Sequence, residues 1–208
     1  MTRARLLDAA KQVFERDGYL EARVTDIAEQ AGVSHGSFYH YFESKEEVFR
    51  EVAEAMQDRL SSHSVVDSGL LGGGPDMMVW ERIRESNHAY LEGYRDEARI
   101  MGVVEQVSRY DPEVGAARFA SETHYTSQTA VVIASLQEHG LVDPRLDPSV
   151  AACALSAMVN RFAEMWFVQG LIECEFDSGV DQLTSLCVNA LQLKDRPRGA
   201  RGGLSRAK

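Results

Sequence analysis

The sequence has few cysteines from which disulfide bonds could form. Its 208 residues include three cysteines, Cys153, Cys174 and Cys187, which are widely spaced. An odd number of distant cysteines does not make a disulfide framework, and no Lys, Arg or His stands next to any of them to favour a reactive thiolate. We therefore expect reduced, buried thiols, as in a cytosolic protein.

Long apolar runs are missing as well. No stretch approaches the ~20 apolar residues that a membrane-spanning helix needs. The first residues, Met1 to Arg5, are not followed by the apolar core of a secretion signal. These absences predict a cytoplasmic protein that has no membrane partner.

The motifs of the common enzyme classes are also absent. The sequence has no GxSxG, Walker, GxGxxG or HExxH motif, and no Cys-x-x-Cys pair that would offer metal ligands. No two of its histidines stand at the i, i+4 spacing of a metal-binding helix. We therefore expect a protein that is not an enzyme and needs no cofactor or metal.

The chain has no excess of positive charge. Its formal net charge is −10, and 8 Lys and Arg face 12 Asp and Glu in residues 1–60. Only residues 194–208 are basic, with 6 Lys and Arg against 1 acidic residue. Because affinity from phosphate neutralisation follows the local cations, such a body does not hold DNA by general electrostatics. Any DNA binding must use a small, oriented patch, which excludes a histone-like role.

Residues 24–42, VTDIAEQAGVSHGSFYHYF, contain two short helical patterns hinged at residues 31–34. Gly32 can take the positive φ that ends the first helix, and Ser34 can cap the second. Apolar side chains are spaced to pack the two helices together: Ile27, Ala31, Val33, Phe38 and Tyr41. The second helix then presents polar groups, as a helix-turn-helix does toward a DNA major groove. The alternative is an ordinary helical hairpin.

Helical signals cover the rest of the chain, and strand patterns are nearly absent, so we predict an all-α fold with about nine helices. A stripe of apolar residues marks a helix at 3–17, and Ser44 caps the next one. Asp-Pro pairs at 111–112 and 147–148 start two long helices, which end at Gly140 and near Gly170. The other expected helices are 77–94, 97–110 and 179–193. Residues 68–75 are expected to be a flexible connection, and the tail from Lys194 to be disordered.

The motif D-I-A-x-x-A-G-V-S-x-G-S-F-Y-x-Y-F-x-S-K-E-E-V, preceded by an amphipathic helix, resembles the DNA-binding region of TetR-family transcriptional regulators over residues 3–56. The resemblance implies an N-terminal three-helix DNA-binding domain, placed at residues 1–46. It also implies a larger helical domain for ligand binding and dimerisation, at 47–193, before a basic tail at 194–208. Ligand binding would move the two recognition helices out of register with the operator.

The resemblance also suggests which side chains meet DNA. His35, Gly36 and Ser37 would read base edges, Tyr39 would contact phosphate or base, and Lys45 would pair with phosphate. The full expected set is Thr25, Ser34, His35, Gly36, Ser37, Tyr39, His40 and Lys45. Where the family often has Ser or Thr before the second helix, this chain has Ala22-Arg23, so Arg23 could add a phosphate contact. The alternative is that the exposed histidines touch no base.

The helix at 148–170 is apolar around most of its circumference and must be covered on two sides. Its small residues Ala151, Ala154 and Ala157, with leucines and a valine of the last helix (Leu183, Leu186, Val188, Leu191 and Leu193), suggest a four-helix interface of a homodimer. The alternative is one large monomeric core. A ligand cavity is expected among these bulky side chains: Trp80, Tyr90, Tyr94, Met101, Tyr125, Phe162, Met165 and Trp166. The alternative is that they are ordinary core residues.

Together these observations predict a ligand-responsive, sequence-specific transcriptional regulator. Its expected partners are a double-stranded DNA operator, a second copy of the chain and a largely apolar small molecule that releases a repressor from the operator. A lipid, steroid, acyl, aromatic or drug-like compound would fit. The alternative is a helical lipid- or hydrophobic-ligand-binding protein without operator binding, which would leave the helix-turn-helix pattern unexplained.

Overall fold

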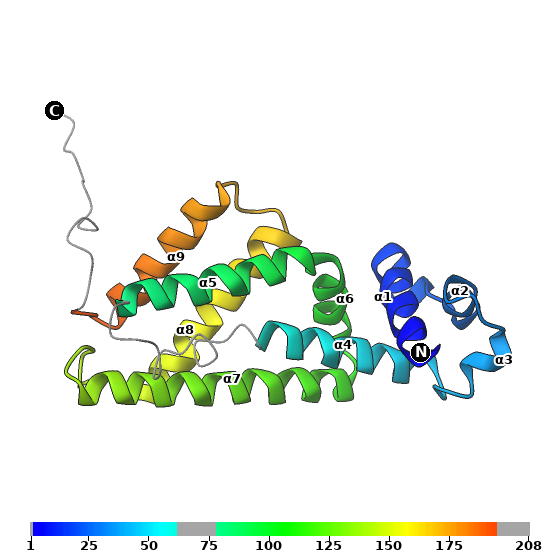
Figure 1. Cartoon of the computed structure of the whole chain (residues 1–208), viewed down its shortest axis with the longest axis horizontal. Helices are drawn as coiled ribbons and strands as arrows, with labels where there is room; N and C mark the ends of the chain where they lie inside the picture. The colour runs from blue at the N-terminus through cyan, green and yellow to red at the C-terminus, as the bar shows by residue number, and fades with distance from the viewer. Residues whose placement is uncertain (1, 62–77, 195–208) are drawn as a thin grey trace. The chain divides into compact units, whose positions relative to one another are not determined.

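The computed structural model describes residues 2–61 and 78–194, and all of the regular secondary structure within these ranges is helical. The all-α prediction is therefore confirmed (Figure 1). The elements are α1 (Thr2–Glu21), α2 (Val24–Gln30), α3 (His35–Phe38), α4 (Lys45–Ser61), α5 (Val79–Asp96), α6 (Ala98–Ser108), α7 (Pro112–Glu138), α8 (Pro148–Ala163), the π-helix η1 (Glu164–Val168) and α9 (Phe176–Ala190). None of the helices in the described ranges has the length and apolar content needed to cross a membrane. The expected flexible connection at 68–75 and the tail after Lys194 lie outside these residues.

Local capping groups begin the helices where the sequence predicts. The Asp111 Oδ1 atom accepts hydrogen bonds from the backbone N–H groups of Glu113 (2.9 Å) and Val114 (3.1 Å) at the start of α7. Asp147 accepts from the N–H of Val150 at 2.9 Å and opens α8 in the same way. Each bond satisfies a backbone donor that the first helical turn leaves without a partner.

Several helix boundaries differ from the prediction by a few residues, and two of these differences have a clear local cause. The helix expected to run from 148 to near 170 changes at Glu164 into the π-helix η1, a wider turn whose signal a hydrophobic pattern does not carry. The last helix begins at Phe176, three residues before the expected position 179. Its start is set by Glu175, whose carboxylate accepts from the N–H groups of Asp177 (3.2 Å) and Ser178 (2.8 Å).

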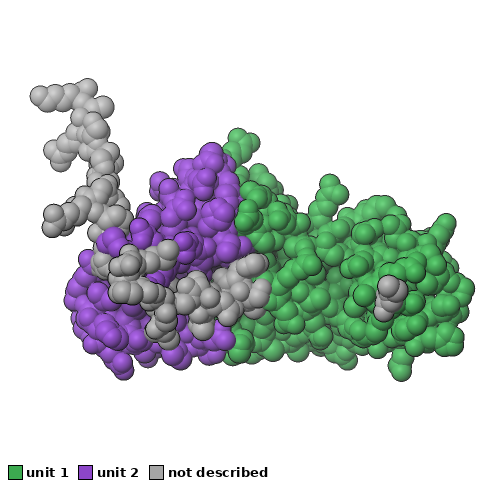
Figure 2. Space-filling view, viewed as in Figure 1, with its two compact units in different colours: residues 1–62, 92–125, 161–173 green, residues 63–91, 126–160, 174–208 purple. Residues whose placement is uncertain are grey.

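The described chain forms two compact units, coloured separately in Figure 2. Unit 1 comprises the described parts of residues 1–62, 92–125 and 161–173, and unit 2 comprises those of 63–91, 126–160 and 174–208. Helices α5, α7 and α8 each contribute residues to both units. Position 46, where the sequence places the end of the DNA-binding domain, lies in the first turn of α4. The functional division at that position stays a prediction.

The core of unit 1 ties α1 to the helix-turn-helix segment and α4. Leu6, Val13 and Phe14 on α1 are completely buried. The Phe14 ring meets Phe49 of α4 edge to face, with 4.9 Å between the ring centroids. The Tyr19 ring packs on the same phenylalanine at 4.8 Å. These contacts join α1 to the first part of α4, and the short helices α2 and α3 lie between these two helices in the sequence.

The core of unit 2 combines residues from α5, α7, α8, α9 and the position directly after α9: Ile83, Val132, Ile133, Leu136, Ala152, Cys187, Val188 and Leu191. Four residues predicted to form a dimer interface, Leu183, Val188, Leu191 and Leu193, are at most 4% exposed. That prediction is wrong for these four, because they fill the interior of their own chain. Leu186, by contrast, is 53% exposed.

The cysteines are only partly as predicted. Cys187 is buried, and its burial raises the thiol pKa to about 11. Cys153 and Cys174 are exposed, so the expectation of three buried thiols is wrong for two of them. Cys153 lies on the outer side of α8, and Cys174 lies in the segment between η1 and α9.

Candidate nucleic-acid interface

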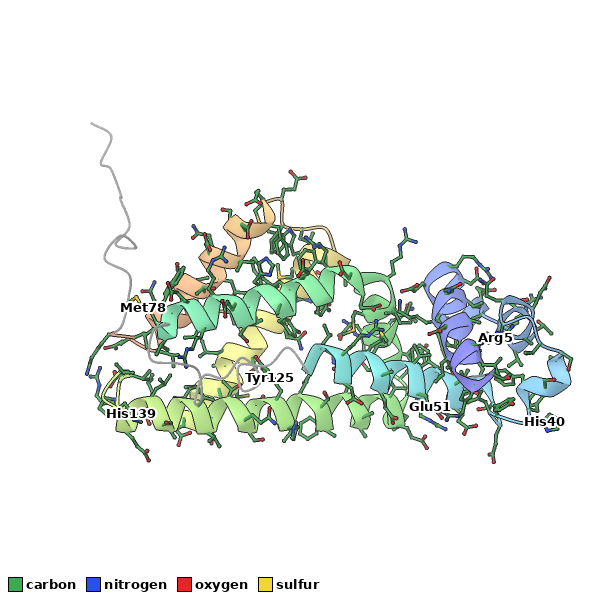
Figure 3. All side chains as sticks on the ribbon, viewed as in Figure 1. Arg5, His40, Glu51, Met78, Tyr125 and His139 are labelled. Atoms are coloured by element: carbon green, nitrogen blue, oxygen red, sulfur yellow. The ribbon has the colours of Figure 1, made fainter. Side chains whose placement is uncertain are left out.

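The turn between α2 and α3 is held by a residue far away in the sequence. Gly32 has φ of 64°, a left-handed conformation that favours glycine, and the N–H of Val33 donates to the Ala28 carbonyl at 3.0 Å. The Arg5 guanidinium on α1 donates to the Ala31 carbonyl (Arg5 is labelled in Figure 3). A Cβ added at Gly32 would lie 3.0 Å from Arg5 Nη2, the end of a flexible side chain, so it is the positive φ of the backbone that favours glycine here.

The start of α3 is set by Ser34, as the sequence predicts. Its backbone is extended, with φ −72° and ψ 152°, and its Oγ accepts from the Ser37 N–H at 3.2 Å. The two hydroxyl oxygens of Ser34 and Ser37 also lie 2.8 Å apart. Ser34 therefore serves the helix start, and its hydroxyl is already hydrogen-bonded within the chain.

Two phenylalanines anchor α3 from its inner side. Phe38 is completely buried, as predicted for a residue that packs the two helices together, and Phe42 is 1% exposed. Tyr41 was expected to pack between the two helices but is 40% exposed, so that expectation is wrong. Phe38 and Phe42 occupy the inner side of the segment, which leaves Tyr41 outside.

The outer side of α3 carries most of the residues expected to meet DNA. His35, Gly36 and His40 are exposed and Tyr39 is 50% exposed; His40, labelled in Figure 3, lies in the turn that follows the helix. The Tyr39 ring packs edge to face on His35 and on the buried Phe38, at centroid distances of 5.1 and 5.3 Å. The phenol is thus held on a rigid support while half of it faces solvent.

Nothing inside the described chain requires glycine at position 36. A Cβ added there would meet no atom within 4 Å, and Gly36 does not have a positive φ. The backbone at the start of α3 is therefore open to solvent. A side chain at this position would come between the helix and any surface that approaches it.

Lys45 stands apart from the other expected DNA contacts. Its ammonium group donates to the carbonyl oxygens of Tyr19 (2.8 Å) and Ala22 (3.0 Å) and lies 3.4 Å from that of Leu20. It also lies 4.6 Å from the centroid of the Tyr19 ring, at cation–π distance. Lys45 therefore satisfies the carbonyl groups at the end of α1.

The segment before α2, which has Ala22-Arg23 where the family often has Ser or Thr, lacks a side-chain cap. Arg23 occupies the N-cap position with extended backbone (φ −121°, ψ 147°), and its side chain makes no capping bond. Thr25, in the first turn, is exposed, and its hydroxyl lies 3.3 Å from the Asp26 carboxylate. Arg23 and Thr25 are thus exposed near the start of α2.

Six of the eight residues expected around a ligand belong to unit 1: Tyr94, Met101, Tyr125, Phe162, Met165 and Trp166. Rings from α8 and η1 form a continuous layer. The ring centroid of Trp166 lies 5.4 Å from that of Phe162 and 4.5 Å from that of Phe167, on which the indole stacks. Tyr94 is 2% exposed, and its ring centroid lies 6.4 Å from that of Phe167. Burial of the Tyr94 phenol, together with the negative charge of Glu164, raises the pKa of Tyr94 to about 12. Trp80 and Tyr90 belong to unit 2, where Trp80 packs against the core.

The sequence reading missed a buried carboxylate in this aromatic layer. Glu164, at the start of η1, is 7% exposed; it pairs with Arg161 at 2.6 Å and accepts from the Gln169 amide at 2.8 Å. The signal was the i, i+3 spacing of Arg161 and Glu164 inside an otherwise apolar helix.

Helix α6 connects η1 with α1 within unit 1. A Cβ added at Gly102 would lie 2.9 Å from Val168 Cγ1, so α6 and η1 approach as closely as a glycine permits. At the start of α6, the buried Glu97 pairs with Lys11 of α1 at 2.8 Å and with Arg59 of α4 at 2.5 Å. The aromatic layer is therefore joined to α1 and α4 through one short helix.

Comparisons with known proteins agree with this arrangement. Residues 6–52 match the family described as bacterial regulatory proteins, tetR family. The chain is 37% identical over 103 residues to the HTH-type transcriptional repressor KstR2 of Mycobacterium tuberculosis, a match covering 47% of this chain and 51% of that protein. It is 33% identical over 105 residues to the uncharacterized HTH-type transcriptional regulator YfiR of Bacillus subtilis, covering 49% and 47%. The matches thus span about half the length of these curated relatives.

Solved structures share the fold over nearly the whole chain. The fatty acid degradation regulator FadR from Bacillus halodurans superposes with a TM-score of 0.75 at 20% identity, covering 93% of this chain and 97% of that one. A transcriptional regulator from Rhodococcus gives a TM-score of 0.72 at 21% identity, covering 95% and 100%. The helix-turn-helix segment is thus similar in sequence to the tetR family of bacterial regulatory proteins, and the all-helical fold of the chain is similar to that of these solved structures.

Proposed function

We propose that this protein is a transcriptional repressor that binds a specific operator through α3. The observation that carries the proposal is that His35, Tyr39 and His40 are exposed along α3 and the turn after it. The buried Phe38 anchors the opposite, inner side of this segment. Such a short, rigid, polar helix after a tight turn has the form of a recognition helix in the major groove. The proposed DNA contacts on α2 and α3 are Thr25, Ser34, His35, Gly36, Ser37, Tyr39 and His40.

We propose that the protein acts as a homodimer, because one recognition helix of this length holds DNA poorly and two-fold symmetry doubles its contacts. An apolar stripe of unit 2 supports this proposal. On α8, Val150 is 68% exposed and is followed on the same side by the exposed Cys153, Ala154 and Ala157. Leu186 on α9 is 53% exposed. These five residues replace the buried leucines as the proposed dimer surface.

We propose that a largely apolar small molecule binds among the rings of α8 and η1 and weakens DNA binding. The support is the ring layer of Phe162, Trp166 and Phe167, with Tyr94 and Glu164 as its polar groups. An effector that displaces η1 would displace α6, because Gly102 and Val168 leave no slack between them. The displacement would reach α1 and α4 through the ion pairs of Glu97.

The function is tested by selecting DNA from a random duplex library with the purified full-length protein. The proposal expects enrichment of a pseudo-palindromic sequence, with half-sites separated by about one helical turn or a multiple of it. Binding of that duplex should exceed binding of a shuffled duplex by at least about 10³-fold. If no sequence is enriched while the protein still binds apolar ligands, the alternative of a hydrophobic-ligand-binding protein without an operator is the better description.

A further inference from the structure

The positive charges of the N-terminal segment are almost all engaged inside the chain. Residues 2–61 contain eight Lys and Arg, and seven of them have a partner. The pairs are Arg3 with Glu51, Arg5 with the Ala31 carbonyl, Lys11 with Glu15 and Glu97, Arg16 with Asp17, Lys45 with the carbonyls that end α1, Arg50 with Glu113 and Arg59 with Glu97.

Arg23 is the exception among these described residues. It is exposed and its side chain makes no hydrogen bond or ion pair there. Its backbone is nevertheless fixed, because its carbonyl accepts from the N–H groups of Asp26 (3.1 Å) and Ile27 (3.2 Å) in the first turn of α2. The result is one unpaired guanidinium on a rigid attachment, in a segment whose net charge is negative.

Lys45 is fully occupied by comparison. If the Lys45 ammonium turned toward a phosphate, the carbonyl oxygens of Tyr19 and Ala22 at the end of α1 would lose their hydrogen-bond donor. The ammonium is moreover held over the Tyr19 ring, which itself packs on Phe49 of the core. Lys45 therefore acts as a structural strut, meaning that its side chain links the start of α4 to the end of α1.

We propose that Arg23 is the residue that neutralises a DNA phosphate in each protomer, and that Lys45 is a structural strut and not a phosphate ligand. The first helix of a helix-turn-helix crosses the DNA backbone, which is where the start of α2 places the Arg23 guanidinium. An arginine fork fits the phosphate oxygens bidentately. This inference rests on the proposed function, because it requires that α3 enters the groove of an operator.

The proposal has a measurable signature in salt dependence. Each neutralised phosphate contributes about −0.9 to the slope of log K against log salt concentration, so the two Arg23 side chains of a dimer contribute about −1.8. Arg23→Gln should therefore make the slope shallower by about 2 and weaken binding at 0.1 M salt by roughly 60-fold, with the loss shrinking toward 1 M salt. Because a phosphate contact carries no base information, the ratio of specific to shuffled duplex affinity should stay the same.

The experiment measures binding of the library-selected duplex and of a shuffled duplex from 0.05 to 0.5 M salt. Arg99→Gln is the matched control, since Arg99 is also exposed and without a partner among the described residues but lies on α6. Lys45→Met should lower the melting temperature and leave the slope unchanged, whereas R23Q should leave the melting temperature unchanged.

Three results would overturn the assignment. They are an unchanged slope for R23Q, an equal change for R99Q, and a change of about 2 for K45M at unaltered melting temperature. These results differ from a failure of the proposed function, in which the wild-type protein enriches no duplex and both proposals fall together.

Discussion

Lys11 on α1 and Glu97 at the start of α6 form an ion pair in which Lys11 Nζ lies 2.8 Å from Glu97 Oε2. Glu97 is 8% exposed and also holds Arg59 of α4. One buried carboxylate therefore joins α1, α4 and α6 of unit 1, and removing its charge should weaken the packing of all three helices.

Glu97→Gln leaves two cations facing a neutral amide in a half-buried site. We expect a loss of about 1–3 kcal/mol, less than for a fully buried pair because both cations keep some contact with water. For a chain of this size the loss lowers the melting temperature by roughly 2–10 °C. Glu85→Gln, at an exposed position of α5, serves as the control and should change nothing. Equal melting temperatures for wild type and E97Q would refute the role of this pair.

The same pair gives a prediction at high pH. Burial lowers the pKa of Lys11, but the hydrogen bonds and charges of Glu97 and Glu15 outweigh it and raise the pKa above 10.5. A lysine whose pKa is higher in the folded state than in the unfolded state stabilises the fold at every pH below its unfolded-state pKa. This stabilisation is lost as the pH rises through the folded-state pKa. The difference in melting temperature between wild type and E97Q should therefore be constant near neutral pH and narrow above pH 10.5.

Tyr39 and Phe38 are adjacent but should respond differently to truncation. Tyr39→Ala removes a half-exposed ring from the proposed DNA surface, so operator affinity should fall by about 10-fold or more with a melting temperature close to wild type. Phe38→Ala removes a completely buried ring and should cost about 3–5 kcal/mol of stability. Gel-shift titration and thermal unfolding of both variants separate the roles; a large stability loss in Y39A would make Tyr39 a core residue.

The proposed dimer surface is tested with two exposed valines of unit 2. Val150→Glu places a charge on the apolar stripe of α8 and should yield monomers in sedimentation experiments. Val131→Glu is the matched control, because Val131 of α7 is 61% exposed, close to the 68% of Val150. If V150E remains as dimeric as V131E, the stripe is not the interface.

Alkylation offers an independent check of that surface. Cys153 and Cys174 are both exposed within one chain, but only Cys153 lies on the stripe. Iodoacetamide should modify Cys153 more slowly in the dimer than after dilution to monomer or in V150E, whereas the rate for Cys174 should be the same in all three. Protection of Cys153 that is independent of concentration would speak against dimer burial.

The contact of α6 with η1 can be tested by a compensating pair. Gly102→Ala introduces a methyl group 2.9 Å from Val168 Cγ1, which forces a shift and should cost about 1–3 kcal/mol. Val168→Ala removes that methyl carbon, so the double variant should be more stable than G102A alone. A double-mutant cycle from urea unfolding measures the coupling, and additive effects would show that the two residues do not press on each other.

Local sequence determined the start of most helices in this protein. Ser34, Asp111 and Asp147 cap helices because their side-chain oxygens bond backbone groups two or three residues away, within reach whatever the rest of the chain does. Gly32 ends α2 for the same local reason. The helix-turn-helix, the all-α class and the inward position of Phe38 could therefore be predicted without a structure.

Tertiary packing decided which side chains remain available for a partner. Lys45 and Arg23 are both cations near helix starts, yet only the position of the α1 carbonyls commits Lys45 to the chain and leaves Arg23 unpaired among the described residues. Periodicity likewise makes Leu183 and Leu186 equivalent candidates for an interface, but one is 1% exposed and the other 53%. Such choices depend on segments distant in sequence that meet only in the folded chain. Sequence therefore determined the elements of this protein, and packing determined which of their surfaces face outward.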